Sequence, residues 1–207
     1  MTTAQALIAF LIAASILTVT PGVDTVLVLR SAASGGRRAG TFAAAGIAMG
    51  CLAWGAMVSI GLGALLAASE FAFTVLKWAG AAYLLYLGVR LIWHPHAGPD
   101  LSGAAPANAL PWQALKQGLL TNLLNPKVGI FYVTLLPQFI PADVNVSAFS
   151  LLLASIHVVL GLAWFAALIA ATVPIGRYLR RPGVNAALNR LTGGVFVMFG
   201  AKLALSR

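Results

Sequence analysis

Long apolar stretches, separated by short polar and basic segments, make up almost the whole chain. Residues 39–69 and 144–176 contain no Asp, Glu, Lys or Arg. Each stretch exceeds the roughly 20 apolar residues that a helix needs to cross a bilayer. The pattern predicts six membrane-spanning helices, over residues 4–29, 41–67, 71–93, 113–139, 147–172 and 186–205. We therefore expect an all-α polytopic membrane protein whose residues 1–207 form one transmembrane domain.

Proline interrupts two of these predicted spans. Pro21 and Gly22 lie within the first span, and Pro126 lies within the fourth. Proline has no backbone N–H, so it stops a helix and frees a carbonyl group. Inside a membrane, freed backbone groups are tolerated only where protein or a water-filled cavity surrounds them. Paired interruptions in two corresponding halves are typical of the binding site of a transporter.

The two halves of the chain share an ordered set of residues. The third predicted span carries Lys77, Gly80, Tyr83 and Tyr86, and the sixth repeats this spacing with Arg190, Gly193, Phe196 and Phe199. We therefore predict a duplication of three spans, with residues 1–93 and 113–207 as the repeats and 94–112 as a cytoplasmic linker. Three is an odd number, so the second repeat is expected to be inverted, with the binding site at the interface of the repeats.

Composition and charge support a membrane location. Hydrophobic residues make up 60% of the chain, charged residues 8%, and the mean hydropathy is +0.94. The net charge of +9 does not indicate a nucleic-acid partner, because the basic residues fall in short segments between spans. Nine of them fall on one side of the predicted membrane and three on the other. This asymmetry places the basic segments in the cytoplasm and both termini outside it.

An acid and a base follow the two prolines. Asp24 can gain and lose a proton, and it can pair with the ammonium group of a substrate. Lys127 can hold a substrate carboxylate or pair with Asp24. Two structural alternatives stay open. Asp24 could pair with Arg30 or face water, and the Asp24–Lys127 pair could only hold the two broken helices together.

Four uncharged polar residues complete the predicted substrate site. Asn122 and Asn125 are three residues apart, so they share one face if the helix continues that far. Asn125 also suits the N-cap of a half-helix that begins at Pro126, because Asn caps well and Pro is favoured at the first helical position. Thr20 and Gln117 are weaker candidates for the same cavity. Asp24 is the predicted proton-coupling residue.

Other chemistries find less support. His94 and His96 lie in the linker without a third ligand nearby, so we expect no metal site. The turn from Gly35 to Gly40 lacks the lysine and hydroxyl residue of a phosphate loop, and no cofactor is expected. The only cysteine, Cys51, has no second thiol with which to form a disulfide. His157 is expected to be a packed, neutral histidine.

In its motifs the chain resembles the LysE/RhtB family of amino-acid exporters. The resemblance rests on Thr20-Pro21-Gly22-Val23-Asp24, on the turn from Gly36 to Gly40, on the segment from Gly80 to Gly88, and on the segments from Gly118 to Lys127 and from Leu136 to Phe139. One departure is Val23, where the family usually has a second proline. The resemblance implies a bacterial inner-membrane protein with six spans that exports amino acids. It further implies use of the proton-motive force and the capacity to form a homodimer.

The predicted function is therefore a secondary transporter that exports small amino acids or close analogues, coupled to proton entry. Its partners are the amino-acid substrate, protons and membrane lipid. A channel, an exporter of another small solute or ion, and an intramembrane enzyme are the alternatives. An enzyme of the hydrolase type needs a nucleophile–base pair, and on the helix face of His157 the only serine candidates are Ser150 and Ser155.

Overall fold

The computed structural model describes residues 2–68, 70–95, 111–171 and 181–205, with backbone alone at 62–68, 70–73, 76, 77 and 185. All secondary structure in these ranges is helical. The elements are α1 (Thr3–Val19), α2 (Val23–Ala68), α3 (Glu70–Trp93), α4 (Pro111–Leu123), α5 (Pro126–Ile130), the π-helix η1 (Phe131–Leu135), the 3₁₀-helix η2 (Leu136–Phe139), α6 (Val146–Ala170) and α8 (Pro182–Leu205). The prediction of an all-helical chain is confirmed.

The first predicted span is broken where proline requires it. The side chain of Thr2 caps α1 together with Gln5, and the helix ends at Val19. Thr20 is extended, with φ −71° and ψ 118°, as expected for a residue before proline. A new helix begins at Val23. The interruption at Pro21 and Gly22 therefore divides a short helix from the start of α2.

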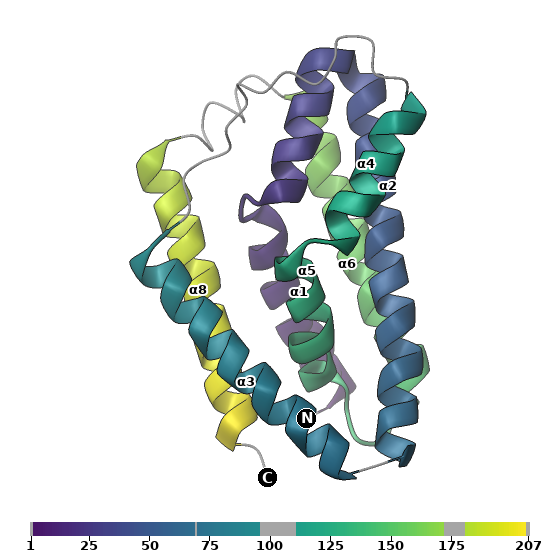
Figure 1. Cartoon of the computed structure of the whole chain (residues 1–207), viewed down its shortest axis with the longest axis vertical. Coiled ribbons are helices and arrows are strands. Elements are labelled where there is room, and N and C mark those ends of the chain that lie inside the picture. The colour runs from purple at the N-terminus through teal and green to yellow at the C-terminus, as the bar shows by residue number, and fades with distance from the viewer. Residues whose placement is uncertain (1, 69, 96–110, 172–180, 206–207) are drawn as a thin grey trace.

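The expected loop between the first two spans is almost absent. Helical backbone continues from Val23 to Ala68, and only Gly36, with φ 70° and ψ −175°, departs from it. The positive φ is one that glycine adopts without steric cost. In Figure 1 the chain folds back at the upper end of α2. Helical turns on either side of Gly36 therefore take the place of the loop that was expected to carry Arg37 and Arg38.

The fourth predicted span is bent at its proline. The helices Pro111–Leu123 and Pro126–Phe139 meet at an angle of 51°. Asn125 is the N-cap of α5, since its Oδ1 accepts from the backbone N–H of Lys127 at 3.1 Å. The predicted cap at Asn125 and the half-helix that begins at Pro126 are confirmed.

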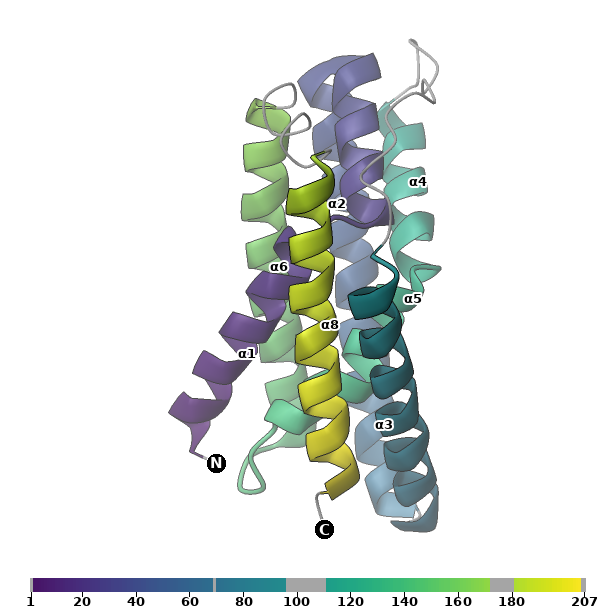
Figure 2. The same cartoon turned by 90° about the vertical axis from the view of Figure 1, so that its left-hand side faces the viewer.

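The helices pack in two groups. Helix α2 packs against α4 and α6, α3 packs against α8, and α1 contacts α6 and α8 (Figure 2). Helices α2 and α4 cross closely, because a Cβ atom at Gly46 would overlap the backbone of Leu115 and one at Gly118 that of Ala43. Such contacts between small residues are a usual way for helices to associate in membranes.

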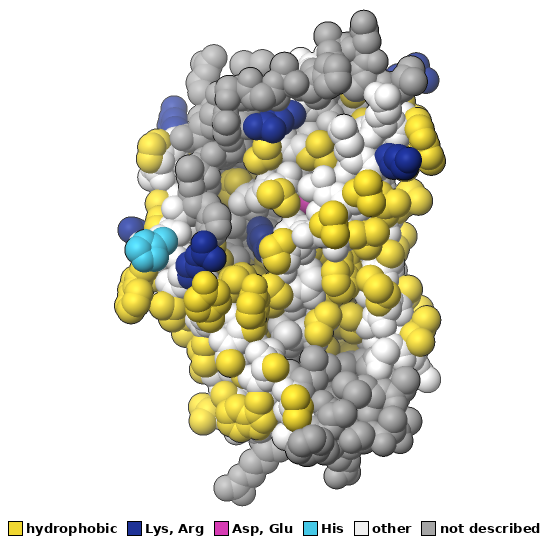
Figure 3. Space-filling model, viewed as in Figure 1, with side chains coloured by type: hydrophobic (Ala, Val, Ile, Leu, Met, Phe, Trp, Pro, Cys, Tyr) yellow, Lys and Arg dark blue, Asp and Glu magenta, His cyan; other side chains and the backbone are white. Residues whose placement is uncertain are grey.

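Length and composition fit a membrane location. Val146–Ala170 is long and apolar enough to cross a bilayer, and so is Val23–Gly61, which contains the reversal at Gly36; the bent pair from Pro111 to Phe139 is a third if it is counted as one span. Hydrophobic side chains cover the middle of the face drawn in Figure 3, whereas basic ones lie in its upper half. In Figure 1 the first turn of α1 and the last turn of α8 lie at the opposite end of the molecule from the point where α2 folds back. The lengths and apolar surfaces of these helices fit a helical membrane protein.

Buried aromatic side chains of three elements pack together in the half of the molecule that carries the termini (Figure 1). We define the aromatic layer as Phe10, Phe131, Tyr132, Phe139 and Phe199, all at most 7% exposed. Ring centroids lie 5.8 Å apart between Phe10 and Phe131, 5.4 Å between Phe10 and Phe139, and 5.0 Å between Phe139 and Phe199. Three elements distant in sequence, α1, the η1–η2 segment and α8, are joined here.

Some predictions fall outside the described ranges. Most of the linker 94–112, including His96, lies there, and so do Arg177 and Arg180 of the last basic segment.

Candidate functional site

Lys127 is bound to the end of α1. Its Nζ donates to the carbonyl oxygen of Leu17 at 3.0 Å and to that of Thr20 at 2.9 Å. In an uninterrupted helix, the N–H of residue 21 would bond to the carbonyl of Leu17. Pro21 has no such N–H. The ammonium group therefore replaces a donor that the proline removes.

The two helix breaks are in contact with each other. A Cβ atom built on Gly22 would lie 3.8 Å from both Cδ and Nζ of Lys127. Lys127 itself is the second residue of α5, directly after the break at Asn125. The side chain thus crosses from the interruption in the second half of the chain to the interruption in the first half.

Asp24 lies in the first turn of α2, where the positive end of the helix dipole favours a carboxylate. Its Oδ2 accepts a hydrogen bond of 2.8 Å from Nδ2 of Asn122, which is fully buried. The same Nδ2 lies 3.4 Å from Sγ of Cys51. The other oxygens of both side chains, Oδ1 of Asp24 and Oδ1 of Asn122, are buried without a hydrogen-bond partner in the described structure.

Asp24 and Lys127 line one cavity, of about 60 Å³. No ion pair joins the two side chains in the described part of the chain, since each binds other groups. Polar lining residues are Thr18, Thr20, Asp24, Thr25, Asn125, Lys127 and His157. Apolar ones include Ile47, Ala48, Val128, Val158, Leu162 and Phe165. Opposite charges therefore face one cavity without neutralising each other in direct contact.

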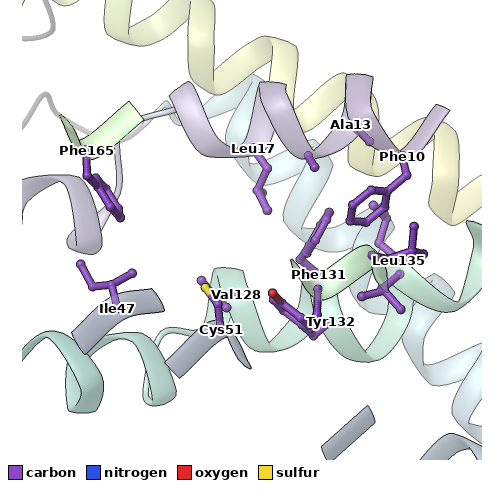
Figure 4. Close-up of a cluster of buried hydrophobic side chains, with 14 of the residues drawn as sticks. Phe10, Ala13, Leu17, Ile47, Cys51, Val128, Phe131, Tyr132, Leu135 and Phe165 are labelled. Atoms are coloured by element: carbon purple, nitrogen blue, oxygen red, sulfur yellow. The ribbon is translucent and has the colours of Figure 1, made fainter. Parts of the chain in front are cut away.

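His157 marks the boundary between the cavity and the aromatic layer. Its Nδ1 lies 3.1 Å from the hydroxyl of Tyr132, and its ring centroid lies 5.0 Å from that of Phe131. Figure 4 shows Phe10, Phe131 and Tyr132 gathered on one side, while Ile47 and Phe165 lie on the other. The cavity is thus closed at the end that lies towards the termini.

Comparisons with known proteins decide what kind of protein carries this cavity. A model of the family described as LysE type translocator matches residues 15–207. The chain belongs to the LysE translocator family.

Its relatives are bacterial membrane proteins that match it over almost their whole length. YrhP, an uncharacterized membrane protein of Bacillus subtilis (strain 168), is 33% identical over 98% of this chain and 100% of its own. The homoserine/homoserine lactone efflux protein of Salmonella typhimurium (strain LT2) is 31% identical over 96% of both chains. The leucine efflux protein of Klebsiella pneumoniae (strain MGH 78578) is 32% identical, over 94% of this chain and 92% of its own. No solved structure matches the chain.

The family confirms that this LysE translocator is a transporter and not an enzyme. The predicted resemblance to the family is confirmed as well.

The structure brings most of the predicted site residues together. Thr20, Asp24, Asn125 and Lys127 line the cavity, and so does Gly22. Asn122 joins them through its hydrogen bond to Asp24. Asn122 and Asn125 do not share a helix face, however, because α4 ends at Leu123. The shared face was predicted only if the helix continued to Asn125, and the helix does not continue that far.

Gln117 is not brought to the cavity. It is exposed on α4 and is absent from the residues that line the cavity. Gln117 and Asn122 are five residues apart, which places them on largely opposite sides of a helix with 3.6 residues per turn. The buried face of α4 carries Ala114, Gly118 and Asn122. Gln117 should have been excluded by this spacing.

Three polar partners in this LysE translocator were not predicted as part of the site. Tyr132 holds His157, Cys51 lies beside Asn122, and Thr192 lies 2.6 Å from Thr20 through their hydroxyl oxygens. A histidine within the uncharged stretch 144–176 indicates that His157 needs a polar partner, which Tyr132 provides. Nothing in the sequence singled out Thr192, because its partner is 172 residues away.

Gly50 provides room for Asn122. A Cβ atom at Gly50 would lie 2.5 Å from Oδ1 and 2.9 Å from Cβ of Asn122. Gly50→Ala is expected to displace Asn122 from Asp24, to lower the free energy of unfolding by roughly 1–3 kcal/mol, and to reduce transport at least tenfold. Thermal unfolding in detergent and transport in proteoliposomes measure these effects.

Gly61→Ala is the matched control for this variant. Gly61 lies on the same helix, and a Cβ atom there meets nothing within 4 Å. The control is expected to be as stable as the original protein or slightly more so, because alanine favours a helix over glycine. Equal stability and transport in the Gly50 and Gly61 variants would contradict the role of Gly50.

Proposed function

We propose that this LysE translocator exports small amino acids or close analogues across the bacterial inner membrane in exchange for protons. The observation that carries the proposal is the arrangement of Asp24 and Lys127. One carboxylate and one ammonium group line a single cavity, and they come from the two broken helices. A zwitterionic amino acid presents the complementary pair of charges. Asp24 binds its ammonium group and Lys127 its carboxylate.

The relatives support an amino-acid substrate. Proteins 31–32% identical to this chain, over at least 94% of its length, are named for the efflux of homoserine, homoserine lactone or leucine. Homoserine and leucine have the same ammonium and carboxylate groups and differ in their side chains. A site built around the common groups suits both.

Proton coupling is assigned to Asp24. One carboxylate oxygen is held by Asn122, and the other has no hydrogen-bond partner in the described structure. A proton and a substrate ammonium group therefore compete for the same side chain. In the proposed cycle, the substrate enters from the cytoplasm and binds the ionised carboxylate. Protonation from the outside then releases the substrate there.

The same proposal includes six spans in two inverted repeats, 1–93 and 113–207. Its support is the contact between the two helix breaks and the packing of α3 against α8. A Cβ atom at Gly88 would meet the carbonyl of Gly193, and one at Gly193 would meet that of Gly88. The basic end, with Arg37 and Arg38, faces the cytoplasm, and both termini face outwards. The homodimer implied by the family resemblance stays a prediction.

Asp24→Asn tests the proposal. The amide keeps the shape of the side chain and much of its hydrogen bonding, but it cannot take up a proton. We expect the variant to lose export driven by a pH gradient, by at least tenfold, and to keep part of its exchange of substrate for substrate. The measurement is transport of labelled leucine, alanine and homoserine in proteoliposomes, with and without a pH gradient.

Two outcomes of this experiment contradict the proposal. Wild-type rates in Asp24→Asn under a pH gradient would remove Asp24 from the coupling mechanism. Flux through the original protein that does not saturate and ignores the pH gradient would instead favour the channel alternative. The aromatic layer supports a transporter over an open channel, because it closes one end of the cavity.

A further inference from the structure

One nitrogen of the His157 ring faces the cavity of this translocator. Nδ1 lies 3.1 Å from the hydroxyl of Tyr132, and the side chain is part of the cavity lining. Among the described residues, Nε2 has no hydrogen-bond partner, yet it is not one of the polar atoms that are enclosed there without a partner. Nε2 is therefore open to the cavity, where a bound molecule can reach it.

A series of polar contacts leads from Asp24 to this ring. An ionised carboxylate only accepts, so the nitrogen of the Asn122 amide is the atom that faces Asp24. The same nitrogen donates to Sγ of Cys51 at 3.4 Å. Because the sulfur accepts there, its own S–H is free to donate elsewhere. The side chain of Cys51 also interacts with that of Tyr132, whose hydroxyl group points towards the thiol in Figure 4.

The order of these donors determines where the proton of His157 lies. Tyr132 belongs to the π-helix η1, a form that often appears at functional sites. When the thiol donates to its hydroxyl oxygen, the O–H of Tyr132 donates to Nδ1 of His157. No carboxylate is hydrogen-bonded to the ring among the described residues, and an unpaired buried charge is costly, so the ring is neutral. A neutral imidazole has one donor and one acceptor nitrogen, which places the proton on Nε2.

His157 lies beside Lys127 at the cavity. The backbone N–H of Phe131 bonds to the carbonyl of Lys127, so these two residues are one helical turn apart on the same face. The His157 ring packs on Phe131, with ring centroids 5.0 Å apart. Lys127 is also the charged group that acts electrostatically on the ring. Because a cavity of about 60 Å³ holds only a few water-sized groups, a carboxylate at Lys127 is also close to His157.

A substrate carboxylate needs more donors than the lysine supplies. It has two oxygens, and a buried oxygen without a donor is costly. Lys127 already donates to the carbonyls of Leu17 and Thr20. The N–H of His157 is the further donor that the second carboxylate oxygen requires.

We propose that His157 is a second ligand of the substrate carboxylate, which it shares with Lys127. Tyr132 is the positioning residue that keeps the N–H of His157 turned towards the cavity. This inference rests on the proposed function. It extends that function by naming the group that the site requires, which is a free carboxylate rather than the amide or lactone formed from it.

The test compares two pairs of ligands that differ at the carboxyl group: leucine with leucinamide, and homoserine with homoserine lactone. Isothermal titration calorimetry in detergent measures the affinities. The original protein is expected to bind each free acid at least tenfold more tightly than its derivative. His157→Leu should lower the affinity for leucine and homoserine at least tenfold. It should change the affinity for the two derivatives less than threefold, because they do not carry the carboxylate.

A conservative variant and a matched control accompany His157→Leu. His157→Gln can place an amide N–H near the position of Nε2, so it should bind leucine at least threefold more tightly than His157→Leu. His94→Leu changes an exposed histidine that follows α3 and should leave all four affinities unchanged. Size-exclusion chromatography and thermal unfolding check that each variant is folded.

The role of Tyr132 has its own readout. Tyr132→Phe removes only the hydroxyl, so Nδ1 is no longer held as an acceptor and the proton can move to it. The affinity for leucine should fall at least threefold and that for leucinamide should not, whereas Tyr86→Phe, on the exposed side of α3, should change neither. In addition, ¹⁵N NMR of the histidine-labelled original protein should show a neutral ring with its proton on Nε2, in a signal that His157→Leu lacks.

The outcomes separate this inference from the function on which it rests. Any other protonation state of the His157 ring would overturn the inference, and this readout needs only the original protein if His157→Leu does not fold. An unchanged preference for the free acids in folded His157→Leu would overturn it as well, while amino-acid binding itself stands. Failure of the original protein to bind either leucine or homoserine would overturn the proposed function, and this inference with it.

Discussion

Lys127→Met is expected to abolish transport and to destabilise the protein strongly. The substitution removes the donor that Leu17 and Thr20 use at the end of α1. Hydrogen bonds to a charged group contribute about 1.5–3 kcal/mol each. The substitution also leaves the carboxylate of Asp24 without a cation at the cavity, which adds to the loss of stability. Thermal unfolding in detergent measures the loss of stability, and amino-acid transport in proteoliposomes measures the loss of function.

Two further variants separate stability from function. Lys116→Met changes an exposed lysine of α4 in the same way and should leave both properties unchanged. The double variant Asp24→Asn, Lys127→Met removes both charges. It should regain part of the stability, because no charge is then left uncompensated, but it should not transport. Transport by this double variant at wild-type rates would show that neither charge is needed for function.

The second large effect is expected at the aromatic layer. Phe131 is fully buried and contacts Phe10, Tyr132 and His157. Phe131→Ala should lower the free energy of unfolding by about 3–5 kcal/mol, as is usual when a buried phenyl ring is truncated. It should also let protons leak through the cavity, since the layer is the seal at that end. A pH-sensitive dye inside proteoliposomes measures the leak without added substrate.

Controls distinguish the seal from a general loss of packing. Phe131→Leu keeps most of the volume and should leak much less than Phe131→Ala. Tyr86→Ala removes an aromatic ring that is 56% exposed on α3, so it should neither leak nor unfold at a lower temperature. A folded Phe131→Ala variant that holds a pH gradient as well as the original protein would contradict the assignment of the seal.

The parts of this fold that depend on neighbouring residues were predictable. Proline ended α1 and began α5, and the cap at Asn125 followed from a residue type that caps well directly before a proline. A turn at Gly35 to Gly40 was predicted, but its helical flanks were not, because a positive φ at one glycine can reverse the chain without a polar loop. The polar segment that contains Arg37 and Arg38 therefore looked like a loop but is helical.

The residues of the site were easier to predict than their partners. Asp24, Asn122 and Lys127 stand out because polar residues within apolar stretches are costly unless they have a purpose. Their contacts were not predictable, since they join residues about 100 positions apart: Asn122 with Asp24, and Lys127 with Leu17 and Thr20. Sequence reasoning considered a direct pair between Asp24 and Lys127. It did not consider backbone carbonyls as the partners of the lysine.

The hydrogen bonds of Lys127 fasten the end of α1 to the start of α5. An ammonium group has three N–H donors, and two of them are already given to the carbonyls of Leu17 and Thr20. Under the proposed function, the third donor is left for a substrate carboxylate, and a second hydrogen bond from Lys127 to that carboxylate would need a donor that is now bound to α1. The end of that helix then depends on the hydroxyl contact between Thr20 and Thr192 of α8. Under the proposed function, substrate binding by Lys127 and its hold on α1 are therefore coupled through the same ammonium group.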